Sequence, residues 1–150
     1  MIFFYSTRQQ DRQVSFYDAV MKGIANDGGL FMPHEILPMD IFFLRGMHHM
    51  SLPEIALGVA KNMIDQAVPD EELVEIILKS CTFDAPLFPL TGTLSVLELF
   101  HGPTLSFKDF GARFMAQLMR YFARNRNREL TILVATSGDT GSAIADAFYG

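Results

Sequence analysis

The chain has 150 residues, a net charge of −5 and a hydrophobic content of 49%, which suffices for one ordinary domain with a real core and excludes general disorder. No apolar run reaches about eighteen residues, so we expect no membrane-spanning segment. The acidic balance gives no reason to expect a nucleic acid or an anionic membrane as partner. Cys81 is the single cysteine, and the apolar start Met1–Tyr5 lacks the features of a signal peptide. These features predict a globular, cytoplasmic protein.

The N-terminal part alternates extended and helical patterns. Ile2–Tyr5 is predicted to be a short strand, followed by a polar loop through Gln13. A helix should begin after Ser15, whose hydroxyl can accept from free amides of the first turn. Asn26–Gly29 is expected to form a turn, because glycine adopts positive φ at no steric cost. Leu30–Pro33 should be a short extended segment.

Two helices are predicted in the middle of the chain. The first is capped by Ser51, has Glu54 placed for a capping box and runs to about Gln66. The second begins at Pro69–Glu72, where the helix dipole favours acidic residues. Three apolar residues at helical spacing should form the buried face of this second helix: Leu73, Ile76 and Ile77.

The pattern after about Leu87 predicts an α/β layer. It begins with a loosely alternating strand, Leu94–Phe100, and a helix, Phe107–Arg124. The apolar run Thr131–Ala135 suits a strand covered on both faces, and Gly141–Phe148 is again helical. The predicted fold class is therefore α/β, with an N-terminal helical segment and short strands followed by the start of a parallel-sheet domain. The helix at 107–124 should bury one stripe: Phe110, Phe114, Leu118 and Tyr121.

Lys108 is the first candidate for a residue with a chemical role. It follows an irregular Gly/Pro loop and opens an apolar helix. A lone lysine there would be interpreted as a surface residue of the first turn. However, the helix dipole disfavours a cation at this end, and the neighbours Leu105, Phe107 and Phe110 are apolar. Both effects favour a neutral, nucleophilic amine, which is what an enzyme needs to hold an aldehyde cofactor.

A second segment, Ala135–Ser142, is a glycine turn that opens another helix. Gly138 and Gly141 permit a tight turn, and a helix start leaves backbone amides unpaired. These amides and the dipole can seat a carboxylate or a phosphate, although an ordinary capped turn has the same composition. No Gly-Lys-Ser/Thr follows, so the segment is not a nucleotide-binding P-loop. Four hydroxyls could assist the anion: Thr136, Ser137, Thr140 and Ser142.

The chain resembles the threonine synthases, which belong to the fold-type II family of pyridoxal-phosphate enzymes. Leu99–Phe110 is similar to their cofactor-lysine segment, and Ala135–Gly150 is similar to their substrate-carboxylate loop and the helix after it. The segments Tyr5–Arg8, Val20–Gly23 and Asp27–Leu30 resemble their N-terminus. These matches follow the family's order over nearly the whole chain. The Tyr-Ser-Thr-Arg start discriminates best, because cysteine synthases and serine/threonine dehydratases begin differently.

The resemblance implies specific roles. Lys108 would bind pyridoxal 5'-phosphate through its amine and later move protons. Asp139 would lie near the phenolic oxygen of the cofactor, where cysteine synthases usually have Asn. The loop from Ser137 to Thr140 would bind the α-carboxylate of the substrate, and His101 would help to shape the site. The implied substrate-binding residues are Ser137, Gly138, Asp139, Thr140, Thr104 and Ser106, and no metal is implied.

The implied reaction is that of a carbon–oxygen lyase, which converts O-phospho-L-homoserine and water to L-threonine and phosphate. Residues 1–86 would form the family's N-terminal domain, and residues 87–150 would begin its cofactor-binding domain. Residues 1–150 offer no candidate for the family's glycine-rich cofactor-phosphate loop or for the group that faces the pyridine nitrogen. We therefore expect a piece of a longer enzyme with little or no activity alone. An unpaired sheet edge would favour its self-association.

Two alternatives remain open. Another fold-type II lyase, acting on a phosphorylated or hydroxy amino acid, would carry the same motifs. A non-catalytic interaction domain could retain them by descent, but it would have no chemical need for Lys108.

The pair His48 and His49 has no acid or cysteine at ligand spacing and is interpreted as a loop pair and not as half of a metal site.

Overall fold

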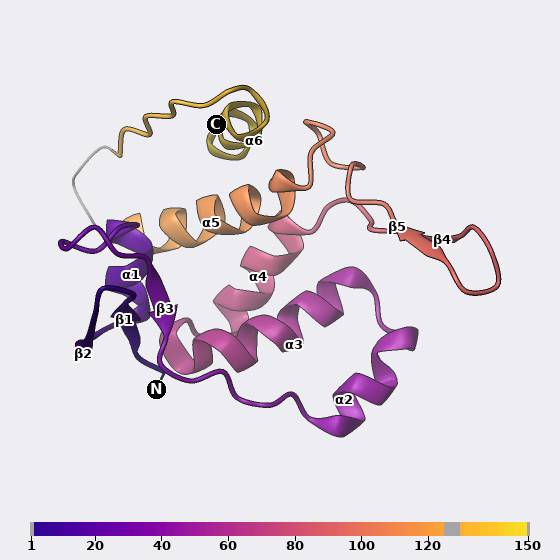
Figure 1. Cartoon of the computed structure of the whole chain (residues 1–150), viewed down its shortest axis with the longest axis horizontal. Helices are drawn as coiled ribbons and strands as arrows, with labels where there is room; N and C mark the ends of the chain where they lie inside the picture. The colour runs from indigo at the N-terminus through magenta and orange to yellow at the C-terminus, as the bar shows by residue number, and fades with distance from the viewer. Residues whose placement is uncertain (1, 125–129, 150) are drawn as a thin grey trace. The chain divides into compact units, whose positions relative to one another are not determined.

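The computed structural model describes residues 2–124 and 130–149 (Figure 1). The chain divides into two compact units, residues 1–75 and 76–150, and the boundary lies within helix α4 (Asp70–Ser80). The first unit contains the three short strands β1 (Phe4–Ser6), β2 (Gln9–Val14) and β3 (Phe31–Pro33). Its helices are α1 (Phe16–Lys22), α2 (Ile41–Gly46) and α3 (Leu52–Ile64), with 3-10 turns at Met47–His49 and Asp65–Ala67.

The sheet of the first unit has the order β2-β1-β3, and both pairings are antiparallel. The predicted strand at Ile2–Tyr5 is present but shifted, at Phe4–Ser6. The predicted loop through Gln13 is wrong, because Gln9–Val14 is strand β2. Its residues are polar and mostly exposed, so no alternation of side chains marks it. Backbone pairing with β1 makes this segment a strand.

The two N-terminal motifs, Tyr5–Arg8 and Asp27–Leu30, bind each other. The Ser6 hydroxyl donates to Asp27 Oδ1 at 2.7 Å, and Arg8 Nη1 donates to the Asp27 carbonyl at 2.9 Å. The predicted glycine turn is confirmed: Gly28 has a φ of 76°, and the Gly29 amide donates to Asp27 Oδ1 at 2.8 Å. The Tyr-Ser-Thr-Arg start therefore fixes the turn to the sheet.

The Ser6 hydroxyl also controls the acidity of Asp27. The hydrogen bonds from Ser6 and then from Gly29 lower the pKa of the Asp27 carboxyl below its usual 3.8. A lowered folded-state pKa means that these bonds stabilise the fold above pH 3.8, and that this stability is lost as the pH falls through the lowered value. We expect Ser6→Ala to raise the pKa of Asp27 toward 3.8, as measured by an NMR pH titration. Ser51→Ala is the control and should leave the Asp27 titration unchanged.

Side-chain caps define the helices of the first unit. Ser15 accepts from the Asp18 amide at 3.0 Å and begins α1, as predicted. The Ser51 amide donates to Glu54 Oε2 at 2.6 Å, which confirms the Glu54 half of the predicted capping box of α3, while the Ser51 hydroxyl donates to the same carboxylate oxygen at 2.7 Å. However, α3 ends at Ile64 and continues only as a 3-10 turn, earlier than the predicted Gln66.

Helix α2 was not predicted, although its start signal is visible in the sequence. Asp40 Oδ1 accepts from the Phe42 amide at 2.8 Å and from the Phe43 amide at 3.1 Å, which is a helix N-cap. A Cβ on Gly58 of α3 would lie 2.2 Å from the Phe43 ring. The absence of a side chain at Gly58 therefore allows α2 to pack closely on α3.

Helix α4 follows its prediction closely. It begins at Asp70 after Pro69, with acidic residues in its first turn. Its predicted buried face is confirmed, with exposed fractions of 0% for Leu73, 4% for Ile76 and 3% for Ile77.

The second unit begins with a hairpin, β4 (Leu87–Pro89) and β5 (Ser95–Leu97), whose strands pair antiparallel. β5 lies within the predicted strand Leu94–Phe100 but is shorter. The prediction of a doubly covered strand at Thr131–Ala135 is wrong: this segment pairs with no strand among the described residues, and Leu133 is 90% exposed. An apolar run becomes a strand only where a partner supplies the hydrogen bonds of its backbone.

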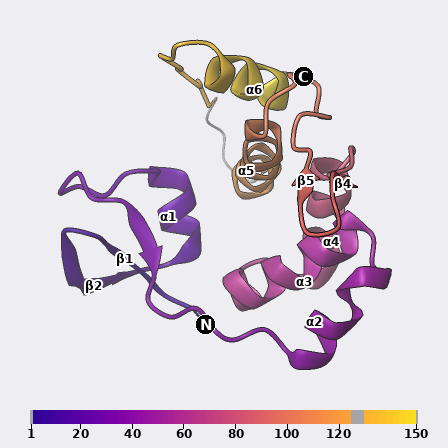
Figure 2. The same ribbon diagram turned by 45° about the vertical axis from the view of Figure 1, so that its right-hand side comes forward.

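Helices α5 (Lys108–Ala123) and α6 (Asp139–Phe148) form the core of the second unit. Figure 1 shows α5 lengthwise and α6 nearly end-on, and Figure 2 shows the reverse, so the two helices cross. Arg113 Nη1 donates to Asp146 Oδ2 at 3.0 Å across this crossing. The small buried residues that allow the close approach are Ala112, Ala116, Ala143 and Ala147.

The predicted aromatic stripe of α5 is only partly correct. Leu118 is buried, but Phe110, Phe114 and Tyr121 are only half-buried. Phe110 packs edge-on against Phe83, with ring centroids 4.7 Å apart. Alanines occupy the closest contact because a bulky side chain there would hold the two helices apart.

Candidate active site at the starts of α5 and α6

Lys108 and Asp139, the charged residues of the two predicted motifs, lie together in the structure. Lys108 is the first residue of α5 and Asp139 the first of α6. The distance between Lys108 Nζ and Asp139 Oδ2 is 4.0 Å, the outer limit of an ion pair. The side chains are 37% and 79% exposed, so both groups are accessible to a ligand. The Lys108 ammonium also lies 5.5 Å from the centroid of the Phe107 ring.

Asp109, which the sequence analysis did not select, organises the loop before the lysine. Its carboxylate is completely buried. Oδ2 accepts from the Thr104 amide at 2.9 Å, and Oδ1 accepts from the Thr104 hydroxyl at 2.6 Å. A Cβ on Gly102 would lie 2.3 Å from Asp109 Oδ2, so only glycine leaves room for the carboxylate. The sequence signal for this role is an acid directly after the lysine, together with the segment Gly-Pro-Thr at 102–104.

The backbone of this loop is strained at one residue. Leu105 has a φ of 58°, a left-handed conformation that is uncommon for a bulky residue and costs about 1–3 kcal/mol. Its amide donates to the Gly102 carbonyl at 3.1 Å, and the bonds between Thr104 and Asp109 close the loop on the other side. These contacts hold the turn that leads the chain into Lys108.

The three polar residues that flank the lysine all make local contacts. His101 Nε2 lies 2.6 Å from Glu98 Oε2, and the His101 ring stacks on Phe100. The Thr104 hydroxyl donates to Asp109, but its oxygen keeps a lone pair for a ligand. Ser106 Oγ accepts from the Lys108 amide at 3.3 Å, and its proton remains available.

The start of α6 is open to an anion. Gly138, the residue before the helix, has a φ of 146°, and no atom lies within 4 Å of the position that a Cβ would take. No side chain caps this end, so the first amides of α6 have no such partner. Thr136 Oγ1 accepts from the Gly138 amide at 3.4 Å, and Ser142 Oγ donates to the Gly138 carbonyl at 3.3 Å. Ser137, just before the helix, and Thr140, in its first turn, are both exposed.

This arrangement suits a ligand that carries both an aldehyde and an anionic group. An accessible primary amine and an uncapped helix start lie side by side, with a carboxylate between them. Among residues 2–124 and 130–149, no cluster of histidine, cysteine, aspartate and glutamate side chains could hold a metal ion. Within the same residues, no helix is long and apolar enough to cross a membrane.

Known proteins match the chain along nearly its whole length. The profile of the family described as threonine synthase N terminus matches residues 3–81. Threonine synthase of Escherichia coli strain K12 is 40% identical over 146 residues, which cover 97% of this chain and 34% of that protein. Threonine synthase of Haemophilus influenzae is 42% identical over 146 residues, with coverages of 97% and 33%.

Solved structures of threonine synthases also match nearly the whole chain. The crystal structure of threonine synthase from Escherichia coli matches with a TM-score of 0.90 and 39% identity, over 99% of this chain and 34% of that one. The structure of PLP-bound threonine synthase from Brucella melitensis matches with a TM-score of 0.90 and 35% identity, over 99% and 33%.

These matches confirm the predicted α/β fold class, although the strand pairs among the described residues are antiparallel and not parallel. The chain spans about one third of the length of the relatives it matches. The family profile covers more than half of the chain, and the relatives share about 40% of its residues. The chain therefore belongs to the threonine synthase N-terminus family.

Proposed function

We propose that this chain supplies the cofactor lysine of a pyridoxal-phosphate-dependent threonine synthase. The reaction is the conversion of O-phospho-L-homoserine and water to L-threonine and phosphate, the chemistry of a carbon–oxygen lyase. The observation that carries the proposal is the 4.0 Å distance between Lys108 Nζ and Asp139 Oδ2. This distance brings together two motifs that are separated in sequence and so supports a single shared site. Similarity to threonine synthases, one of them PLP-bound, supports the choice of substrate and cofactor.

Lys108 has two roles in this proposal. Its amine holds the cofactor, and once substrate is bound the same amine takes and returns protons at the substrate carbons. Pyridoxal phosphate, when bound, supplies an electron sink for the negative charge left by proton removal. Positioned proton transfer of this kind typically contributes about 10²–10⁴-fold in rate. The buried Asp109 and the strained Leu105 keep the amine in place.

The start of α6 binds the substrate carboxylate in this proposal. The amides after Gly138 and the helix dipole attract the anion, and the hydroxyls of Ser137 and Thr140 donate to it. Asp139 orients the cofactor edge near the lysine. Thr104 and Ser106 remain substrate-binding candidates through the lone pair and the proton that their loop contacts leave unused.

Three further expectations belong to the same proposal. The family's N-terminal domain would end at residue 86 and the cofactor-binding domain would begin at residue 87. The protein would act in the cytoplasm. The chain alone would self-associate, because the hairpin of the second unit exposes large apolar side chains, with Leu87 64% and Phe88 53% exposed.

Borohydride reduction of the chain with pyridoxal phosphate, followed by peptide mass mapping, tests the proposed lysine. The chain has four lysines, and Lys22, Lys61 and Lys79 are all more exposed than Lys108. Labelling governed by exposure alone would therefore favour the other three. We expect the label to concentrate on Lys108, because in this proposal Lys108 and Asp139 hold the cofactor together and raise its local concentration at this amine.

Two variants complete this test. Lys108→Arg should lose the selective label while keeping the charge, and Asp139→Asn should reduce the preference for Lys108. Equal labelling of all four lysines would contradict the proposed site. Detectable threonine formation by the chain alone would contradict the expectation that it needs further residues.

A further inference from the structure

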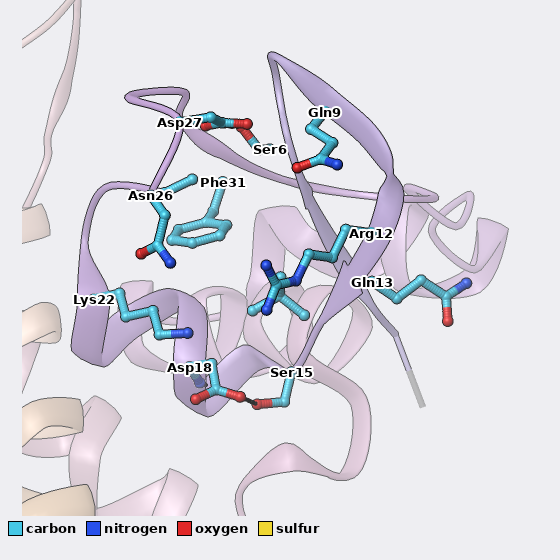
Figure 3. Close-up of a pocket in the computed structure, with 12 residues that line it drawn as sticks. Ser6, Gln9, Arg12, Gln13, Ser15, Asp18, Lys22, Asn26, Asp27 and Phe31 are labelled. Carbon is cyan, nitrogen blue, oxygen red and sulfur yellow. Dashed lines mark hydrogen bonds between the residues drawn. The ribbon is translucent and has the colours of Figure 1, made fainter.

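A partly open polar cavity of about 140 Å³ lies in the first unit, and none of the residues of the proposed active site lines it (Figure 3). Strand β2, helix α1 and the turn after α1 form its walls. Its apolar lining includes Phe31 and Val14, and its polar lining is rich in charged and amide side chains. The proposed reaction uses none of the residues that line this cavity.

Two cations from different elements face the cavity. Arg12 comes from β2 and Lys22 from the last turn of α1, and Figure 3 shows both side chains directed into the same space, with the Asn26 amide beside them. Among the described residues, neither cation has a hydrogen bond or an ion pair. Together they offer several donors to one anionic group.

The two acidic residues that line the cavity, Asp18 and Asp27, differ in how many of their carboxylate oxygens already accept hydrogen bonds. Asp27 is occupied, because it accepts from the Ser6 hydroxyl and the Gly29 amide and lies beside Arg8. Asp18 Oδ2 accepts from the Ser15 hydroxyl at 2.8 Å, and its other carboxylate oxygen is available. The cavity therefore presents two cations, Arg12 and Lys22, and one carboxylate oxygen of Asp18 that can still bind a ligand. A ligand that matches this set carries a negative and a positive group.

We propose that this cavity binds a small α-amino acid. Its carboxylate would pair with Arg12 and Lys22, its ammonium with Asp18, and its side chain would lie toward Phe31. The volume of the cavity suits a small amino acid. One water molecule occupies about 10–15 Å³ of cavity volume, so the cavity has room for roughly ten heavy atoms. A phosphate ion would fill only part of it and would be repelled by Asp18. The inference uses none of the residues of the proposed threonine synthase site.

An NMR titration of the chain with four probes tests this assignment. L-Valine carries both groups, isovalerate lacks the ammonium, isobutylamine lacks the carboxylate, and inorganic phosphate is the simple anion. We expect saturable shifts of cavity amides with L-valine and at least about tenfold weaker binding of the other three, a difference that corresponds to about 1.4 kcal/mol. Equal or tighter binding of phosphate or isovalerate, or no saturable shift with L-valine, overturns the proposal.

Matched variants locate the binding. Arg12→Gln and Lys22→Gln should each weaken L-valine binding about tenfold, whereas Arg45→Gln removes a cation from the same unit outside the cavity and should have no effect. Asp18→Asn should weaken L-valine but not isovalerate. The amide spectrum of each variant reports whether the first unit is still folded. Equal loss in the Arg45 variant would show that overall charge, and not the cavity, attracts the ligand.

Discussion

Gly102→Ala is expected to destabilise the second unit by about 1–3 kcal/mol and to abolish the selective labelling of Lys108. The added Cβ would lie 2.3 Å from Asp109 Oδ2 and 2.8 Å from Asp109 Cβ. Asp109 cannot move away, since it is completely buried and bonded twice to Thr104. The loop must shift instead, and the direction of the Lys108 side chain changes with it. Thermal unfolding measures the first effect, and borohydride mapping measures the second.

Gly111→Ala is the matched control for this prediction. Gly111 lies inside α5, has no positive φ and has no atom within 4 Å of the position of a Cβ. The same substitution there should stabilise the chain by about 0.5–1 kcal/mol, because alanine loses less backbone entropy in a helix. Equal effects of the two substitutions would mean that Asp109 does not set the position of the loop.

Ala143→Leu is expected to separate the two halves of the proposed site. Ala143 is 1% exposed and packs in the alanine cluster where α5 and α6 cross. A leucine there overfills the contact, which costs about 1–3 kcal/mol and pushes α6 away from α5. Because Asp139 begins α6, its carboxylate should then leave the neighbourhood of Lys108. Unfolding experiments and a reduced preference for Lys108 in labelling would report the change.

Ala145→Leu provides the comparison for this second prediction. Ala145 lies on the same helix, but its side chain is exposed. The added volume has room in the open pocket that Ala145 lines, so stability and labelling should change little, within about 0.5 kcal/mol. A large effect at Ala145 with none at Ala143 would contradict the described crossing of the helices.

Local signals in the sequence predicted the helices well. Ser15 caps α1 as expected, Glu54 accepts from the Ser51 amide at the start of α3, and Leu73 is buried on α4. The cap of α2 at Asp40 is a local signal of the same kind. Each of these features depends on residues within one or two turns of one another, which is why single-sequence reasoning reaches them.

The strands were predicted less well. β2 is a strand only because it pairs with β1, and its polar side chains give no alternating pattern. The apolar run Thr131–Ala135 has the composition of a buried strand but pairs with nothing among the described residues. Strand formation depends on a partner elsewhere in the chain, and composition alone does not report whether the partner is in place.

The chemical groups of the candidate site are visible in the order of the residues: an amine at Lys108, a glycine turn with hydroxyls at 136–142, and a carboxylate at Asp139. The folded chain is needed to see that Lys108 and Asp139 meet, that Asp109 is buried against Gly102, and that Arg12 and Lys22 face one cavity. The two groups of features differ in the sequence separation of the residues involved. Caps and turns are fixed by neighbours in the chain, whereas these contacts arise from packing between segments far apart in sequence.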